Sequence, residues 1–209
     1  MNKLIRFALL LISVTTASSA LAQIANLNDL EAQLQKFSLV RGNFTQSRQI
    51  EMFDQPLIST GEFLLEKSHG LLWQQQSPFP VNLVLTEDRL RQTFTNQPAQ
   101  VITAQENPMA FYFSKIFLSV FHGDTQQLQS QFDLNFEPDA EQWQLTLIPK
   151  QAPLKTVFES ITLQGNTDID SLVLQEVRGD KTEIHFTNQT HQPEMLTDAE
   201  QEQFQFQAK

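Results

Sequence analysis

The sequence contains no cysteine, which excludes disulfide bonds, a thiol nucleophile, a thiolate metal site and a lipidated cysteine. Other catalytic and metal-binding patterns are missing as well. The four histidines, His69, His122, His185 and His191, lack metal-ligand spacing. No serine-hydrolase elbow, zinc-protease motif, phosphate loop or dinucleotide fingerprint occurs. We therefore expect a protein that is not an enzyme, with no catalytic residue, no metal and no cofactor.

Basic side chains and tyrosine are scarce. The chain has 14 Lys and Arg residues against 24 Asp and Glu, a formal net charge of −10. Such a surface repels nucleic acid, so we expect no nucleic-acid partner. A single tyrosine accompanies 17 phenylalanines, and phenylalanine is the aromatic residue that needs no polar partner. Many of these rings are therefore expected to line one dry interior.

The N-terminal residues indicate secretion. Lys3 and Arg6 precede an apolar run at residues 7–14, and small residues flank Leu21 in the Ala-Leu-Ala sequence at 20–22. This pattern is typical of a signal peptide, with cleavage expected after Ala22. No later apolar run approaches the length of a membrane span. We expect a signal peptide at residues 1–22 and one mature domain at residues 23–209.

Residues 57–67 organise the rest of the chain. Every second residue falls on one face: Leu57, Ser59, Gly61, Phe63, Leu65 and Lys67. Alternation of this length predicts a strand, and residues 68–70 predict a turn into a second arm at 71–75. Lys67 follows Phe63 and Leu65 on the same face, which leaves two interpretations. The lysine either extends into water at the strand end or places a cation at the rim of an apolar cavity.

Most of the remaining chain shows strand patterns. Further strands are expected near residues 40–52, 81–86, 89–95, 101–104, 129–136, 143–148, 154–163, 172–177, 183–188 and 204–206. Short turns between them predict an antiparallel sheet of about ten or eleven strands in total. A short helix is expected first, from a capping pair formed by Asn28 and Glu31. A second capping pair, Thr197 and Glu200, lies near the C-terminus.

One segment changes to helical spacing. Asn107 and Pro108 have the chemistry of a helix start, and Gly123 lies where a helix would end. Between them, at residues 109–121, apolar side chains recur on almost every side. A helix of this kind needs cover on most of its surface. It is either a plain core helix or a plug that lies in an apolar hollow.

Several short motifs occur in an order that resembles the LolA family of periplasmic lipoprotein carriers. They are Asn-Phe-Thr-Gln at 43–46, Gly61, Trp73, Pro78, Asn-Pro at 107–108, Leu147 and Pro-Lys at 149–150. The resemblance implies a mainly β fold, an incomplete antiparallel β-barrel with helices that cover a hydrophobic cavity. It also implies a monomeric periplasmic carrier of acylated cargo. Such a carrier takes lipoprotein or lipid acyl chains from an inner-membrane donor transporter to an outer-membrane acceptor.

The resemblance and the residue pattern together give candidate site residues. The expected cavity lining is Phe44, Phe63, Leu65, Trp73, Met109, Phe113, Phe117 and Phe121. Lys67 and Ser68 stand where the family has Arg-Pro, and that arginine is thought to hold a lid helix closed. We expect Lys67 at the cavity mouth, donating to lid backbone or a cargo head group. Lysine keeps the charge of arginine but lacks its planar fork.

This departure leaves alternatives to a lipoprotein carrier. One is a dedicated carrier of a glycolipid or a pigment lipid. The other is an adaptor in envelope biogenesis that has the same fold and moves no lipid.

Overall fold

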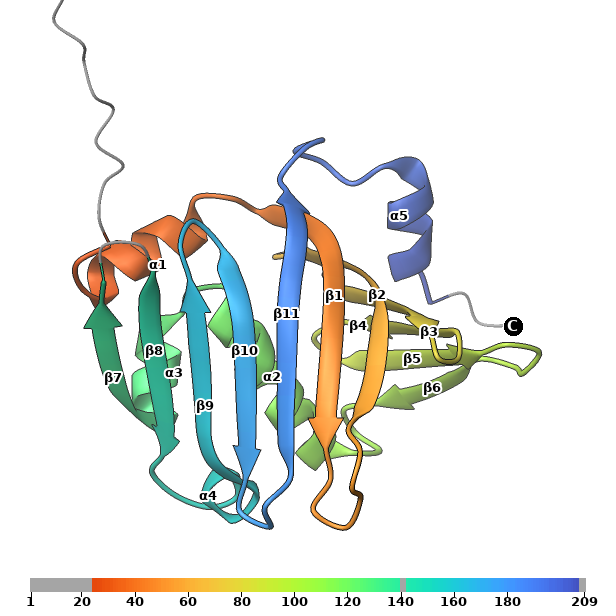
Figure 1. The fold of residues 1–209 in the computed structure, drawn as a ribbon. Helices are drawn as coiled ribbons and strands as arrows, with labels where there is room; N and C mark the ends of the chain where they lie inside the picture. The colour runs from red at the N-terminus through yellow and green to blue at the C-terminus, as the bar shows by residue number, and fades with distance from the viewer. Residues whose placement is uncertain (1–23, 140–141, 207–209) are drawn as a thin grey trace, which may run out of the picture.

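A computed structural model describes residues 24–139 and 142–206 of the chain. The predicted signal peptide and its cleavage after Ala22 lie outside the described residues. Figure 1 shows one long, curved sheet with helices packed on its two faces. No helix in the described part of the chain is long and apolar enough to span a membrane.

Within the described residues, the sheet has eleven antiparallel strands. In chain order they are β1 (Leu39–Gln49), β2 (Leu57–Glu66), β3 (Gly70–Ser77), β4 (Val81–Leu85), β5 (Arg89–Phe94), β6 (Gln100–Thr103), β7 (Phe132–Pro138), β8 (Trp143–Pro149), β9 (Phe158–Gly165), β10 (Ile169–Glu176) and β11 (Lys181–Thr190). Their order across the sheet is β6-β5-β4-β3-β2-β1-β11-β10-β9-β8-β7. Because β6 and β7 remain two separate edges in this order, the sheet is open. The predicted incomplete antiparallel barrel is confirmed.

The hairpin formed by β2 and β3 follows the alternation in the sequence. Ser59, Gly61, Phe63 and Leu65 are buried on one face of β2, which we call the inner face of the sheet. The chain then turns back through Gly70, whose φ of 121° favours glycine over other residues. The predicted strand, turn and return arm are therefore confirmed.

The helices are α1 (Leu27–Gln35), α2 (Pro108–Phe121), α3 (Thr125–Gln131), α4 (Leu154–Val157) and α5 (Asp198–Phe204). In Figure 1, α2 and α3 lie behind the sheet, and α5 lies apart from them beside β2 and β3. The helix predicted at residues 109–121 is α2, capped by Asn107 as expected. Thr197 and Glu200 form the predicted capping box of α5.

Four local predictions were wrong. The cap of α1 is Asn26, whose side chain accepts the backbone N–H groups of residues 28 and 29, so Asn28 lies inside the helix. The strand expected from residue 129 begins at Phe132, because Asp124 caps the short helix α3 before it. The strand expected from residue 154 begins at Phe158, after α4. Residues 204–206 form no strand, because α5 continues to Phe204.

Both faces of the β2–β4 region are apolar, for different reasons. Leu65, Leu71 and Leu85 belong to the main core on the inner face. Their neighbours along the same strands, Leu64, Leu72 and Val84, form a second cluster with Phe204 of α5. Since side chains alternate along a strand, α5 covers the outer face while α2 covers the inner one.

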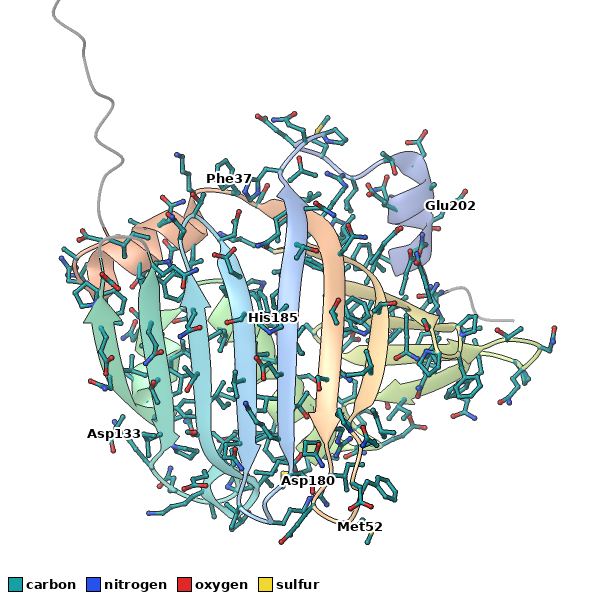
Figure 2. All side chains as sticks on the ribbon, viewed as in Figure 1. Phe37, Met52, Asp133, Asp180, His185 and Glu202 are labelled. Atoms are coloured by element: carbon teal, nitrogen blue, oxygen red, sulfur yellow. The ribbon has the colours of Figure 1, made fainter. Side chains whose placement is uncertain are left out.

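One end of the sheet adjoins α1, and the opposite end carries loops between neighbouring strands. Figure 2 shows Phe37 at the end where α1 joins β1, and Met52 and Asp180 at the opposite end, in loops between neighbouring strands. Glu202 lies on α5, away from both. His185 points outward from β11 in the same view, and its side chain is exposed.

Candidate functional site: an apolar cavity beneath α2

An apolar cavity of about 380 Å³ lies between α2 and the inner face of the sheet. Its size falls within the range of roughly 300–1,000 Å³ that is typical of small-molecule sites. Only Gln46 and Ser114 are polar among the described residues that line it. The apolar lining residues are Leu71, Trp73, Leu83, Leu85, Leu90, Phe113, Ile116, Phe117, Val120, Leu154, Phe158, Ile161, Leu172, Leu174 and Ile184.

Alternate positions on several strands supply most of this lining. Leu71 and Trp73 come from β3, Leu83 and Leu85 from β4, and Leu90 from β5. Strands β9, β10 and β11 supply the opposite wall. The helix α2 closes the space, and its Phe113 packs edge-on against Phe158 with ring centroids 5.9 Å apart.

An aromatic cluster packs against the cavity wall at Trp73. The ring of Phe44 stacks on Trp73 with centroids 3.6 Å apart, and Phe63 meets Phe186 at 5.0 Å. Phe44 pairs across the strands with Gly61. A Cβ at position 61 would lie 2.8 Å from the Phe44 ring and 2.1 Å from a backbone oxygen of β3. Phe44, Gly61 and Trp73, which carried the family resemblance, therefore meet at one place.

The predicted site residues do not all line the cavity. Trp73, Phe113 and Phe117 do. Phe44 and Phe63 are buried in the main core and are not among the residues that line the cavity. Leu65 and Phe121 line a separate pocket of about 30 Å³, together with Lys67.

Met109 is a correction to the expected lining. Its side chain is 50% exposed, and it is not among the residues that line the cavity. The reason is geometric, because Met109 lies in the first turn of a 14-residue helix that extends past the cavity.

Sequence reasoning missed the leucines of β4 and β5 and the wall from β9 to β11. Their strand alternation was visible in the sequence. However, alternation does not say which face of a strand points inward when both faces carry apolar residues.

Apolar contacts hold α2 on the sheet. The hydroxyl groups of Ser114 and Ser119 donate to carbonyl oxygens of the same helix. The hydroxyl of Tyr112 donates to Gln131 of α3 at 2.7 Å. Within the described residues, no side chain of α2 forms a hydrogen bond to a strand of the sheet. The helix can therefore separate from the sheet without breaking a side-chain hydrogen bond to it.

Lys67 lies directly after β2, at the end of the sheet near α1. Its Nζ donates to the backbone oxygen of Leu34 at 3.2 Å, and its backbone N–H donates to Ser38 at 3.0 Å. Partial burial lowers the pKa of Lys67 below its usual range. The lysine therefore connects β2 to α1. The expected acceptors were lid backbone or a cargo head group, and the second of these stays a prediction.

His191 and the turn at residues 168–170 interact with each other near α1. His191 stacks on Phe37 and contacts a carboxylate oxygen of Asp168 at 3.2 Å. Burial, and then the neighbouring charge of Asp168, raise the pKa of Asp170. In the described ranges, no group of three or more His, Cys, Asp or Glu residues could hold a metal ion.

Comparison with known proteins gives a family match. Residues 35–207 match the sequence profile of the family described as "Outer membrane lipoprotein carrier protein LolA". That match covers most of the chain. At the level of sequence alone, no individual characterised protein matches significantly.

Solved structures with a similar arrangement are distant in sequence. The MucA/MucB complex of Pseudomonas aeruginosa matches with 17% identity and a TM-score of 0.48, over 78% of this chain and 55% of the matched chain. This chain thus spans just over half the length of that relative. A LolA superfamily protein of Nitrosomonas europaea matches with 8% identity and a TM-score of 0.45, over 81% of this chain and 93% of the matched chain. A domain described as an outer membrane lipoprotein-sorting protein, from Vibrio parahaemolyticus, matches with 8% identity and a TM-score of 0.46. The match covers 85% of this chain and 95% of the matched chain.

Proposed function

The chain belongs to the LolA outer membrane lipoprotein carrier family, and on that premise we propose that it is a periplasmic carrier of acylated cargo. In this proposal the cavity beneath α2 holds an acyl chain of a lipoprotein or another lipid. The single observation that carries it is the cavity itself, about 380 Å³ in volume and lined by apolar side chains except at Gln46 and Ser114.

The energetics suit a carrier that shields one chain from water. Transfer of an acyl chain of about 16 carbons from water into an apolar site is favourable by roughly 13 kcal/mol, at about 0.8 kcal/mol per methylene. A permanently open cavity would therefore release its cargo very slowly. A helix that refills the cavity as the cargo leaves competes for the same apolar surface and lowers the net affinity.

The helix α2 is the element we assign to this role. Phe113 and Phe117 face the cavity, and apolar contacts alone connect α2 to the strands in the described structure. Apolar contacts are non-directional, so cargo methylenes can replace them. The alternative, a plain core helix, predicts that α2 cannot leave the sheet without unfolding the protein.

The proposed route follows from the family. The protein would be exported by the signal peptide expected at residues 1–22, with cleavage after Ala22. It would act in the periplasm as a monomer, taking cargo from an inner-membrane donor transporter and giving it to an outer-membrane acceptor.

Mass spectrometry of the protein purified from the periplasm of an expressing cell tests this function. We expect a bound acylated molecule under native conditions and its release on denaturation. A lipoprotein fragment supports the lipoprotein carrier, and a glycolipid or pigment lipid supports the dedicated carrier. Protein that contains no lipid, and binds no added acyl probe, would contradict a carrier and favour the adaptor alternative.

A further inference from the structure

A second, polar pocket of about 280 Å³ begins where the apolar cavity ends. Ser114 of α2 lines both spaces. On β3, Leu71 lines the cavity and its neighbour Gly70 lines the polar pocket. The same change occurs between Leu85 at the end of β4 and Thr86. The two spaces are therefore adjacent along one side of α2.

Two polar groups in this pocket have unused hydrogen-bonding capacity. An ammonium group has three donors, and Lys67 Nζ donates one of them, to the neutral carbonyl of Leu34. No carboxylate in the described residues forms an ion pair with Lys67. The Nε2 atom of His122 is buried and has no hydrogen-bond partner among the described residues. A buried polar atom without a partner is costly, so an anion that accepts from both groups would be stabilised.

The carboxylates near this pocket either accept hydrogen bonds from neighbouring residues or are exposed at its rim. The carboxylate of Asp124 accepts a backbone N–H as the cap of α3. The carboxylate of Glu66 accepts from Ser68 and His69. Glu87 is exposed in the turn after β4. None of these carboxylates therefore accepts from Lys67 Nζ or His122 Nε2 in the described structure, and both groups keep donors for a ligand.

We propose that this polar pocket binds the anionic head group of an amphiphilic cargo whose apolar chain occupies the neighbouring cavity, with Lys67 Nζ and His122 Nε2 as donors. This inference rests on the proposed carrier function and adds the class of cargo, an acyl chain with a carboxylate or phosphate head. The exposed Lys115 at the same pocket adds attraction for an anion.

The state of His122 without cargo agrees with this arrangement. Burial, and then the charge of Lys67, lower the pKa of His122, and the charges of Asp124 and Glu66 oppose the shift. An anion bound between the lysine and the histidine would screen that repulsion. It would favour the protonated ring and raise the pKa of His122.

Two acyl probes that share one fluorescent chain test the proposal, one a fatty acid and the other its methyl ester. At neutral pH we expect the wild type to bind the acid about tenfold or more tightly than the ester, as a charge-assisted hydrogen bond allows. Lys67→Met should remove this preference, because it weakens binding of the acid far more than binding of the ester. The control is Lys155→Met, which alters an exposed lysine of α4 outside both pockets and should keep the preference.

NMR titration of the His122 ring provides a second readout. We expect its pKa to rise when the fatty acid binds and to stay unchanged with the ester. Acetate and inorganic phosphate, which lack an acyl chain, should leave it unchanged at the concentration that saturates the acid probe.

Each contrary outcome is distinct. Equal wild-type affinities for the two probes would overturn the head-group site and leave the carrier function standing, since both probes still bind. Equal weakening of both probes by Lys67→Met would show that the lysine only supports packing, which also overturns the proposal. A response of His122 to acetate or phosphate as large as the response to the acid would assign the pocket to a free anion. Binding of neither probe would contradict the carrier function itself.

Discussion

Phe44, Gly61 and Trp73 show how single residues shape the cavity wall. Phe44 lies between the other two, stacked on the Trp73 ring and directly across from Gly61 in the neighbouring strand. Glycine at position 61 leaves room for the Phe44 ring and the backbone of β3. The position of Trp73 on the cavity wall therefore depends on a residue with no side chain on the adjacent strand.

Gly61→Ala should destabilise the protein. The added Cβ would lie 2.1 Å from the backbone oxygen of Gln74, so the β2–β3 hairpin must shift. Overpacking of this kind costs about 1–3 kcal/mol in the free energy of unfolding, and we expect the upper part of that range. Urea unfolding measures it, with Thr45→Ala, an exposed change beside Phe44, as the control. A Gly61→Ala protein as stable as the control would show that the strands adjust freely.

Arg41 and Glu200 connect α5 to the sheet. Arg41 donates to both carboxylate oxygens of Glu200, at 2.7 and 2.9 Å, and to the backbone of residues 193 and 195. Hydrogen bonds to the Glu200 carboxylate, first from Arg41 and then from Thr197, lower its pKa from the usual 4.5 to about 2. The helix is thus held on the outer face by an acid that stays ionised well below neutral pH.

The stabilisation from Glu200 should depend on pH. Because the pKa is lower in the folded state, this contribution is present above pH 4.5 and is lost as the pH falls towards about 2. Glu200→Gln should therefore lower the free energy of unfolding at pH 7. Between pH 5 and pH 2.5 the variant should lose less of this free energy than the wild type does. The measurement is the urea midpoint across this range. Parallel pH curves for the two proteins would show that the ion pair contributes nothing.

On the scale of elements, α2 has two competing interpretations, a movable cover of the cavity and a plain core helix. Phe117→Asp places a charge inside the apolar cavity, and burial of an unpaired charge is strongly unfavourable. We expect this variant to lose at least about tenfold in affinity for an environment-sensitive acyl probe. Met109→Asp is a matched control on the same helix, because Met109 is exposed and lies outside the cavity.

The melting temperatures of both variants separate the two interpretations of α2. If Phe117→Asp stays folded and loses the probe, α2 covers a binding cavity. Equal binding by both variants would count against this helix as the cavity cover. If Phe117→Asp unfolds while Met109→Asp does not, α2 is a plain core helix.

Over the whole molecule, α5 and α2 cover opposite faces of one sheet. Residues 64 and 65, 71 and 72, and 84 and 85 alternate between the outer cluster under α5 and the core under α2. This doubly covered region shows why the cavity lining was only partly predictable. The alternation of β2 and the capping signals of α2 are local, and both were read correctly from the sequence.

The remaining features depend on contacts between distant parts of the chain. Leu64 looks like a surface residue of an alternating strand until Phe204 covers it. Lys67 was expected to donate to lid backbone or to a cargo head group, and its acceptor in this structure is Leu34 of α1, far away in the sequence. The exposure of Met109 depends on where α2 crosses the sheet, which the sequence pattern does not specify.

The central claim, that the cavity beneath α2 holds an acyl chain, can be tested with the two tryptophans of the chain. Trp73 lines the cavity, whereas Trp143 lies outside its lining and donates its indole N–H to a backbone oxygen of Asn166 at 2.8 Å. Two variants, Trp143→Phe and Trp73→Phe, each keep one of them. The measurement is quenching of tryptophan fluorescence by a fatty acid that carries bromine on its acyl chain. We predict strong, saturable quenching of Trp73 and little quenching of Trp143. Equal quenching of both, or quenching of Trp143 alone, would contradict the assignment of this cavity to cargo.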